Sequence, residues 1–207
     1  MSAVKIRVKE LFGTLGLLPT VDAIYGNAHQ LAQLPDATRQ YLYNHWITHV
    51  PSNRARLAYL RAVLGVPIGE HSFVHMGCFF AGTEISIGHH TVIGRQCTLS
   101  GAGATLTIGN NVSITARAYV FTASHDVNSP DFASTHSDVT IDDHAWIGAG
   151  AMIMPGVHVG RGAVLGAMAT ATKDLPEFSI WAGVPARQIG TRSRDLAYTL
   201  RYEPYLA

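Results

Sequence analysis

The side chains best suited to chemistry in this 207-residue sequence lie in one stretch, FTASHDVNSPDFASTHSDVT, which spans residues 121–140. It contains His125 and His136, and Asp126 directly follows the first histidine. Imidazole titrates near neutral pH, so a histidine can accept a proton from a hydroxyl group and release it afterwards. Asp126 either orients His125 or contacts a substrate, or it simply turns the chain, as aspartate often does. The stretch is therefore predicted to carry acid–base chemistry.

Other reactive residue types have a plainer interpretation. Cys78 and Cys97 lie in strand-like apolar sequence, where a buried, reduced thiol is commoner than a nucleophile or a bridge. His136 is expected to be a solvated loop residue, and His144 and His158 are expected at solvent-facing turns. The reduced thiols favour a cytoplasmic protein.

The elements that would position the histidine stretch follow from a repeat. Aliphatic or other apolar residues recur every six positions from Ile68 to Ala171, with one extra residue after Phe80, a short insertion after Leu99 and a long gap between Val120 and Ile141. The series is Ile68, Val74, Phe80, Ile87, Ile93, Leu99, Ile108, Ile114, Val120, Ile141, Ile147, Ile153, Val159, Leu165 and Ala171. A small or moderate residue, such as Cys78 or Ala145, usually follows four positions later.

A six-residue repeat suits one short strand and one turn, and three repeats close a triangular coil. The aliphatic side chain would point into the prism, and Gly or Asn in the turns would accept backbone angles that other residues resist. A β-sandwich would instead alternate with period two and irregular turns. We therefore predict a mainly β fold, a parallel β-helix of about five triangular coils with a protruding loop at residues 121–138.

Residues 1–66 are predicted to form an N-terminal helical segment. Helical spacing extends from Thr38 to Leu64, Pro51 divides it, Ser52 can cap the second helix, and Gly65 ends it. The expected apolar face comprises Tyr41, Leu42, Ile47, Leu57, Leu60, Val63 and Leu64. A solvated basic face is expected at Arg54, Arg56 and Arg61.

Three segments carry a family resemblance: IGNNVSITARAYVFTASHD, IDDHAWIGAGAMIMPGVHVGRGAVLGAMATATKDLP and WAGVPARQIG. With them, the region from Ile68 to about Ile189 resembles the hexapeptide-repeat acyltransferases. Within that family it is most similar to the maltose, galactoside and xenobiotic O-acetyltransferases and to bacterial polysaccharide O-acetyltransferases. The resemblance implies left-handed coiling, a homotrimer, and an acetyl-CoA site between adjacent subunits. It assigns residues 67–190 to the transferase domain and 191–207 to a C-terminal tail.

The resemblance also implies roles for individual residues. His125 matches the histidine that takes the proton from the acceptor hydroxyl, in a ternary complex that needs no acyl-enzyme and no metal. Trp146 matches a tryptophan beside the pantetheine arm of CoA, and Gly148 and Ala149 match the backbone that approaches this arm. Two basic residues match those that approach the CoA phosphates, Lys173 and Arg187.

The acceptor is implied to be a hydroxyl of a sugar or polysaccharide-type molecule. Gln96 stands where the sugar O-acetyltransferases have an asparagine that contacts the acceptor, so this position departs from the family pattern. Asp126 and Phe132 are candidate acceptor contacts, and Phe79 and Phe80 are expected to complete the pocket.

Two other functions remain open on the same scaffold. The fragment EHSFVHMGC, with His71 and His75, is compatible with a γ-carbonic-anhydrase-like metalloenzyme. A catalytically silent trimeric scaffold is the other alternative, because a fold does not fix a function.

The overall charge excludes one class of partner. Fifteen basic and fourteen acidic residues give a net charge of +1, which does not favour a nucleic-acid-binding protein. The stretch from Lys5 to Val21 has basic residues before an apolar run, but Glu10 and the lack of a cleavage site argue against a secretion signal. A peripheral membrane contact by this stretch remains open.

Overall fold

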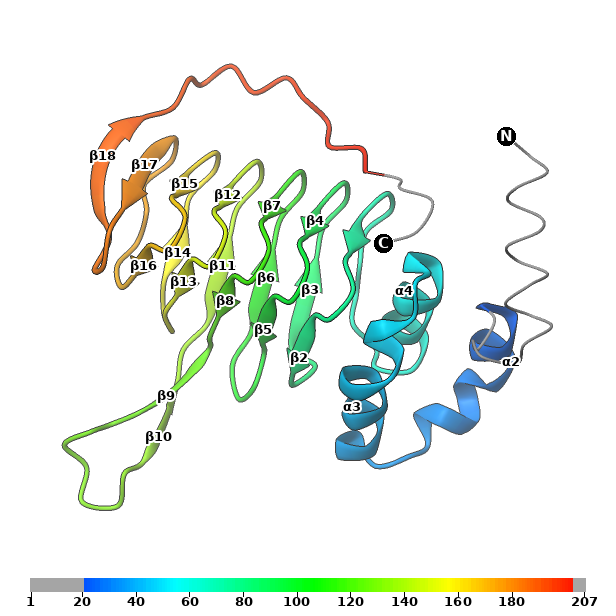
Figure 1. Ribbon diagram of the computed structural model, residues 1–207. Coiled ribbons are helices and arrows are strands. Elements are labelled where there is room, and N and C mark those ends of the chain that lie inside the picture. Colours follow the sequence, from blue (N-terminus) through cyan, green and yellow to red (C-terminus); the bar gives the residue numbers. More distant parts are fainter. Residues whose placement is uncertain (1–20, 203–207) are drawn as a thin grey trace.

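The computed structural model of the protein describes residues 21–202, which form a three-sided parallel β solenoid covered at one end by helices (Figure 1). The stretch from Lys5 to Thr20, with its open membrane contact, lies outside the described residues. Successive strands enter a seven-stranded, a five-stranded and a four-stranded sheet in turn, and each pairs in parallel with the strand of the next coil.

The sheets are built from very short strands. The seven-stranded sheet contains β1 (Phe73–Val74), β4 (Val92–Ile93), β7 (Ser113–Ile114), β12 (Trp146–Ile147), β15 (Val164–Leu165), β17 (Ser179–Ala182) and β18 (Arg187–Thr191). The five-stranded sheet contains β2 (Phe79–Ala81), β5 (Thr98–Ser100), β8 (Tyr119–Val120), β13 (Met152–Ile153) and β16 (Thr170–Ala171). The four-stranded sheet contains β3 (Ile85–Ile87), β6 (Leu106–Ile108), β11 (Val139–Ile141) and β14 (His158–Val159). We name each corner by the sheets that the chain joins there: the seven-five, five-four and four-seven corners.

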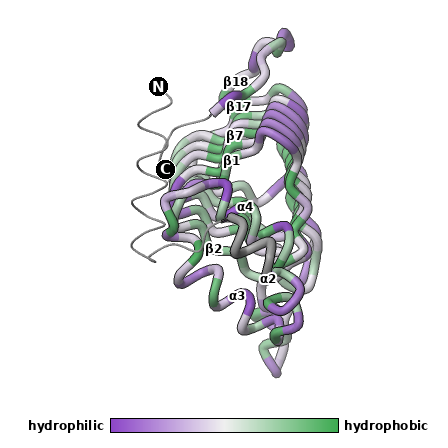
Figure 2. Tube along the Cα trace, turned by 90° about the vertical axis from the view of Figure 1, so that its right-hand side faces the viewer, coloured by the Kyte–Doolittle hydropathy of each residue, from purple (hydrophilic) through white to green (hydrophobic). Residues whose placement is uncertain are grey.

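The repeat predicts the core. All fifteen members of the six-residue series are buried, and so are the residues four positions later except where the repeat is interrupted, after Phe80, Leu99 and Val120. Figure 2, viewed along the solenoid, shows the coils stacked one behind another, with hydrophilic residues gathered along an outer corner.

The turn positions match the expectation in part, because glycines and Asn111 hold some of the left-handed turns. The left-handed backbone conformation falls three positions after the inward aliphatic, and it is adopted by His90, Gln96, Arg117 and His144 as well as by glycines. The glycine directly after the aliphatic has another purpose. At Gly148, an added Cβ would collide with the backbone of Ala167 in the next coil. Glycine there permits close stacking of coils, while several of the left-handed angles fall on residues with side chains.

The helical segment contains α2 (Val21–Ala32), α3 (Asp36–His45), a 3₁₀ turn η1 (Ile47–His49) and α4 (Asn53–Ala62). Ser52 caps α4 by accepting a hydrogen bond from the amide of Ala55, and Gly65 ends the segment with φ of 71°. The helical pattern already breaks at Trp46, before Pro51. The predicted apolar face is wrong at Tyr41, which is exposed, whereas Tyr43 is buried against the first coil.

Side chains of the helical segment make hydrogen bonds to the backbone of the first coil, where a preceding coil would otherwise pair. Asn44 bonds both the amide and the carbonyl of Phe80 at 2.9 Å, and Thr48 donates to the carbonyl of Cys78 at 2.8 Å. Asn53 accepts from the amide of Val74. These bonds satisfy backbone groups of the first coil that no preceding strand could reach, and they close an edge that would otherwise invite pairing.

Arg56 corrects the expectation of a solvated basic face. Its side chain is fully buried, and its guanidinium donates to the carbonyls of Val74 and Val50. Arg61 is also turned inward and donates to the carbonyls of Ile68 and Gly69. Burial lowers the pKa of Arg56 from its ordinary value. The arginines fasten the helices to the solenoid instead of decorating a surface.

The other end of the solenoid closes with β17 and β18, which pair antiparallel. Residues 192–202 then run back along the four-seven corner (Figure 1). His144 lies half-buried beneath this tail, and one of its ring nitrogens is 3.3 Å from the carbonyl oxygen of Tyr198. The amide of Leu200 donates to Asn111, and Tyr202 packs edge-on against Phe73. His158 is not at a turn as expected: it lies on β14 and pairs with Asp142 at 2.7 Å.

Candidate functional site

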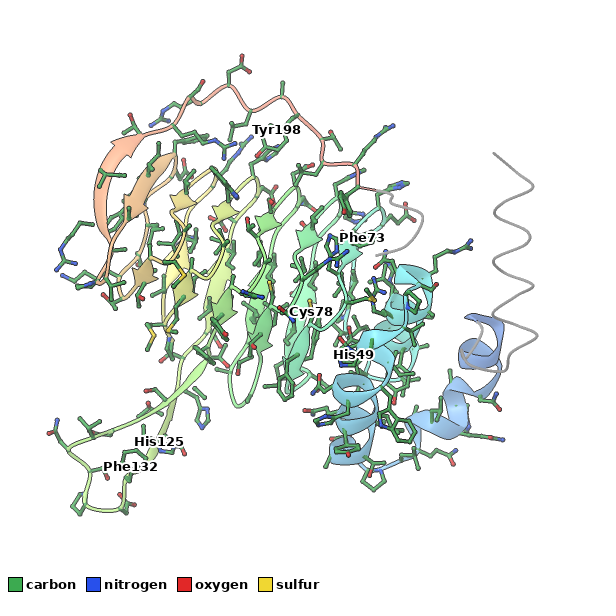
Figure 3. The ribbon with its side chains drawn as sticks, in the orientation of Figure 1. His49, Phe73, Cys78, His125, Phe132 and Tyr198 are labelled. Atoms are coloured by element: carbon green, nitrogen blue, oxygen red, sulfur yellow. The ribbon has the colours of Figure 1, made fainter. Side chains whose placement is uncertain are left out.

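The histidine stretch forms a hairpin that projects from the five-four corner (Figure 3). Strands β9 (Ala123–His125) and β10 (Ser134–His136) pair antiparallel, with His125 opposite Ser134. The hairpin begins directly after β8 and returns the chain to β11, so the parallel ladders continue on both sides of it. Its side chains are exposed, in contrast to the buried interior of the coils.

His125 is held by Phe132, which lies in the loop between β9 and β10. The Nδ1 atom of His125 lies 2.9 Å from the backbone carbonyl oxygen of Phe132, and the two rings stack with centroids 4.3 Å apart and planes 7° apart. A carbonyl oxygen only accepts hydrogen bonds, so Nδ1 must carry the proton in this contact. In the neutral imidazole, Nε2 then holds the lone pair and can accept a proton.

The two aspartates beside this contact shape the loop. Asp126 accepts a hydrogen bond from the amide of Asn128 at 2.9 Å, and its own amide donates to Ala133. Asp126 therefore turns the chain, which is one of its three predicted roles. The group that orients His125 is the backbone carbonyl of Phe132 and not the Asp126 carboxylate. At the tip, a hydrogen bond from Ser129 holds the pKa of the Asp131 carboxyl below its usual value.

His136 lies at the base of the hairpin. Its Nδ1 is 3.1 Å from the carbonyl oxygen of Ala102, an arrangement like that of His125. It borders a shallow, open hollow of about 620 Å³ at the five-four corner. The lining residues are Glu84, Gly103, Ala104, Thr105, His136, Ser137 and Asp138. His136 is thus not a freely solvated residue, but it lies apart from the His125–Phe132 pair.

The residues expected to meet the donor lie on the seven-stranded sheet and at the seven-five corner. Trp146 is on β12 with 49% of its surface exposed, and its indole nitrogen donates to Thr115 at 3.2 Å. Gly148 and Ala149 follow at the seven-five corner, where Ala149 is exposed and Gly148 is buried. A half-exposed indole beside bare backbone is a suitable wall for a thin, partly apolar chain.

The two expected phosphate-binding cations are exposed at different places. Arg187 begins β18, close to the seven-five corner, because the neighbouring amide of Ala186 donates to Thr170 of β16. Lys173 lies past β16 at the five-four corner. The structure therefore does not bring these two cations together at one corner of the chain.

Gln96 also lies at the seven-five corner, two coils before Ala149. Its side-chain oxygen accepts a hydrogen bond from Nε of Arg117 at 3.0 Å. Phe79 is exposed on the outer face of the five-stranded sheet, but Phe80 is fully buried in the core. The expectation that Phe80 lines an acceptor pocket is wrong, because its place in the six-residue series points it inward.

Within one chain, the hairpin and the seven-five corner are separate. His125 projects from the five-four corner, while Trp146, Ala149 and Gln96 lie on another sheet and another corner of the prism. Figures 1 and 3 show the hairpin extending away from the body of the solenoid.

The cysteines and the remaining histidines lie elsewhere. Cys78 and Cys97 are free and buried at successive coils, as expected. His71 lies at the four-seven corner and stacks on His90, whereas His75 lies at the seven-five corner. Among residues 21–202, no group of three or more His, Cys, Asp and Glu side chains is placed to hold a metal ion. The described helices include none long and apolar enough to cross a bilayer.

Comparison with known proteins connects this arrangement to a family. The family described as bacterial transferase hexapeptide (six repeats) matches residues 138–173. The galactoside O-acetyltransferase of Escherichia coli K12 is 31% identical over 161 residues, which cover 76% of this chain and 77% of that protein. The chain belongs to the hexapeptide-repeat acyltransferases. The alignments of this chain with three other curated relatives cover only 55 to 59% of the length of those relatives.

Two solved structures of acyltransferases agree with the fold. A hexapeptide-repeat acetyltransferase from Vibrio cholerae superposes with a TM-score of 0.67 at 26% identity, covering 81% of this chain and 93% of that one. An N-acyltransferase from Bacillus cereus, solved with dTDP-4-amino-4,6-dideoxyglucose and coenzyme A, gives a TM-score of 0.59 at 27% identity. That match covers 62% of this chain and 74% of the Bacillus protein.

Sequence reasoning missed two features of the site. The carbonyl of Phe132 that orients His125 has no sequence signal, because any residue supplies a carbonyl. Arg117 does have a signal: it occupies a turn position where glycine or asparagine is expected, three residues after the inward Ile114.

Proposed function

We propose that this protein transfers the acetyl group of acetyl-CoA to a hydroxyl of a carbohydrate acceptor, with His125 as the general base. The single observation that carries the proposal is the contact between Nδ1 of His125 and the carbonyl of Phe132. It fixes the tautomer in which Nε2 can accept a proton. An alcohol is a weak nucleophile at neutral pH, so an acceptor hydroxyl needs such a base.

The reaction needs no covalent intermediate. The acceptor oxygen attacks the thioester carbonyl as its proton passes to Nε2 of His125. The carbon–sulfur bond then breaks, and the imidazolium returns the proton to the CoA thiolate. The buried cysteines take no part in this sequence.

Two relatives support the donor and the class of acceptor. The Escherichia coli protein is named for O-acetylation of galactosides, and the Bacillus protein binds coenzyme A together with a nucleotide-linked amino sugar. The Bacillus protein acylates nitrogen, so the preference for oxygen rests on His125 and on the Escherichia coli relative.

We further propose that the working form is a homotrimer in which the hairpin of one copy faces the seven-five corner of its neighbour. Cyclic assemblies use such head-to-tail contacts. A second copy would bring His125 to Trp146, Gly148 and Ala149, which one chain holds apart. Arg187 and Lys173 would then serve the CoA phosphates from different chains.

The test is acetyl transfer from labelled acetyl-CoA to a panel of mono- and oligosaccharides. His125→Ala should lower turnover about 10²- to 10⁴-fold, the usual contribution of a general base. Acetyl-CoA affinity should stay near that of the wild type. His136→Ala is the matched control, because His136 also bonds a carbonyl through Nδ1 but lies at the hairpin base. Undiminished turnover of His125→Ala would refute the assignment.

A further inference from the structure

The corners of the solenoid differ in charge. The carboxylates of residues 67–190 lie at the five-four corner, with its hairpin, and at the four-seven corner. They are Glu70, Glu84, Asp126, Asp131, Asp138, Asp142, Asp143, Asp174 and Glu177. The seven-five corner has exposed cations instead, Arg95 and Arg117 in consecutive coils. A protein with nearly balanced charge therefore keeps one cationic corner without acidic neighbours.

The guanidinium of Arg117 has the geometry to bind an anion. Its Nε donates to the side-chain oxygen of Gln96, and no carboxylate pairs with it among the described residues. The two terminal nitrogens of the guanidinium are left as a planar fork, the geometry that fits a carboxylate or phosphate. Arg117 and Gln96 both have left-handed backbone angles, with φ of 60° and 58°. Glycine would suit these turns better, so the side chains are present at a conformational cost.

One further cation, the buried Arg56, adds to the positive potential. The buried Arg56 contacts only backbone carbonyls among its hydrogen-bond partners. Burial lowers the pKa of His75 at the same corner, and the positive charges of Arg95 and Arg56 lower it further. The positive charges of Arg95 and Arg56 favour an anion at this corner.

Aromatic rings lie on the five-stranded sheet that follows the cationic corner. Tyr119 lies two residues after Arg117 and begins β8, Phe79 begins β2, and both register with Thr98 on the outer face of the five-stranded sheet. They are 37% and 41% exposed, and Phe121 stacks near Tyr119 with centroids 6.1 Å apart. Aromatic faces next to a guanidinium fork suit a ring that has an apolar face and an anionic substituent.

We propose that Arg117, oriented by Gln96 and assisted by Arg95, binds the anionic group of a saccharide acceptor whose ring rests against Tyr119. This inference rests on the proposed function and specifies its acceptor as a sugar with a carboxylate or phosphate. The location fits transfer chemistry: the amide of Gly150 donates to Ala116, so Arg117 lies one coil before Ala149, about 4.8 Å along the solenoid.

The experiment measures binding by calorimetry for a neutral hexose, its uronic acid and its 6-phosphate, with wild-type protein and Arg117→Gly. Glycine accepts the left-handed turn, so the variant should fold with an unreduced melting temperature. We expect wild-type protein to bind at least one anionic sugar more tightly than the neutral one. Arg117→Gly should lose about 10- to 100-fold of that affinity, the worth of hydrogen bonds to charged groups. The two anionic sugars distinguish carboxylate from phosphate.

Arg161→Ala is the charge-matched control, because Arg161 is an exposed arginine at the four-seven corner. It should leave the affinity for anionic sugars unchanged. An equal loss in both variants, equal binding of neutral and anionic sugars by the wild type, or a loss of acetyl-CoA affinity in Arg117→Gly in place of acceptor affinity would overturn the inference. Binding is measured without turnover, so selective binding without acetyl transfer would refute the proposed function alone.

Discussion

The solenoid body and the hairpin between β8 and β11 are built on opposite principles. In the body, the short strands are held by ladders of backbone bonds to the neighbouring coils, and the inward side chains are buried. In the hairpin, the side chains are exposed, and His125 depends on one carbonyl and one ring, both from Phe132.

This contrast separates stability from chemistry. A solenoid is stabilised by its nearest-neighbour interfaces, so changes inside a coil are transmitted to the adjacent ones. An exposed hairpin adds little buried surface and can be altered at small cost in stability. We therefore expect body variants to change the free energy of unfolding and hairpin variants to change turnover.

Removing the hairpin tests the contrast most strongly. Replacement of residues 123–136 by a short Gly-Ser linker should abolish measurable acetyl transfer, because it removes His125. The free energy of unfolding should change by about 1 kcal/mol or less, since long surface loops cost little entropy. Denaturant titration and the acetyl transfer assay measure the two effects, and a collapse of stability would show that the two regions are coupled.

Arg56→Ala is expected to have the largest effect on stability. It leaves the carbonyls of Val74 and Val50 buried without their donor, which costs about 2–4 kcal/mol. Arg54→Ala, on the same helix at the exposed position, is the control and should be nearly neutral. A change of less than about 0.5 kcal/mol for Arg56→Ala, by urea denaturation, would contradict the role of these bonds.

Gly148→Ala should lower the free energy of unfolding by about 1–3 kcal/mol, because the new methyl group forces two coils apart. Ala149→Ser changes the exposed neighbour and should be almost silent in stability. Thermal melting of the two variants measures the difference. Equal melting temperatures would show that the coils accommodate the added methyl group without loss of stability.

Phe132→Leu gives the smallest effect and probes the hairpin alone. The carbonyl that holds His125 remains, but the stacked ring is lost, a change worth about 0.5–1.5 kcal/mol. We expect a decrease in kcat of about 2- to 10-fold with an unaltered melting temperature. Val127→Ala, an exposed change in the same loop, serves as control. A lower melting temperature with normal kcat would assign Phe132 to structure instead.

The sequence predicts the body much better than the site. A six-residue period can be recognised because every coil repeats the same packing problem, so the sequence correctly predicts burial of the fifteen series members from Ile68 to Ala171. The burial of Arg56 could not be read from α4, because its partners are the backbone carbonyls of Val50 and Val74, which only the folded chain brings to it. The contact between His125 and Phe132 has the same cause: a carbonyl is present at every residue, and only the folded hairpin selects one.

The most direct test of the central claim is complementation between two inactive variants. His125→Ala disables the hairpin, and Ala149→Glu blocks the seven-five corner where the pantetheine arm would lie. If each site takes its hairpin from one copy and its corner from the next, random mixing of equal amounts should restore about one quarter of wild-type activity. If both parts came from one chain, every chain in the mixture would retain a defect. Activity no greater than that of the separate variants, in assemblies shown to contain both chains, would contradict the account.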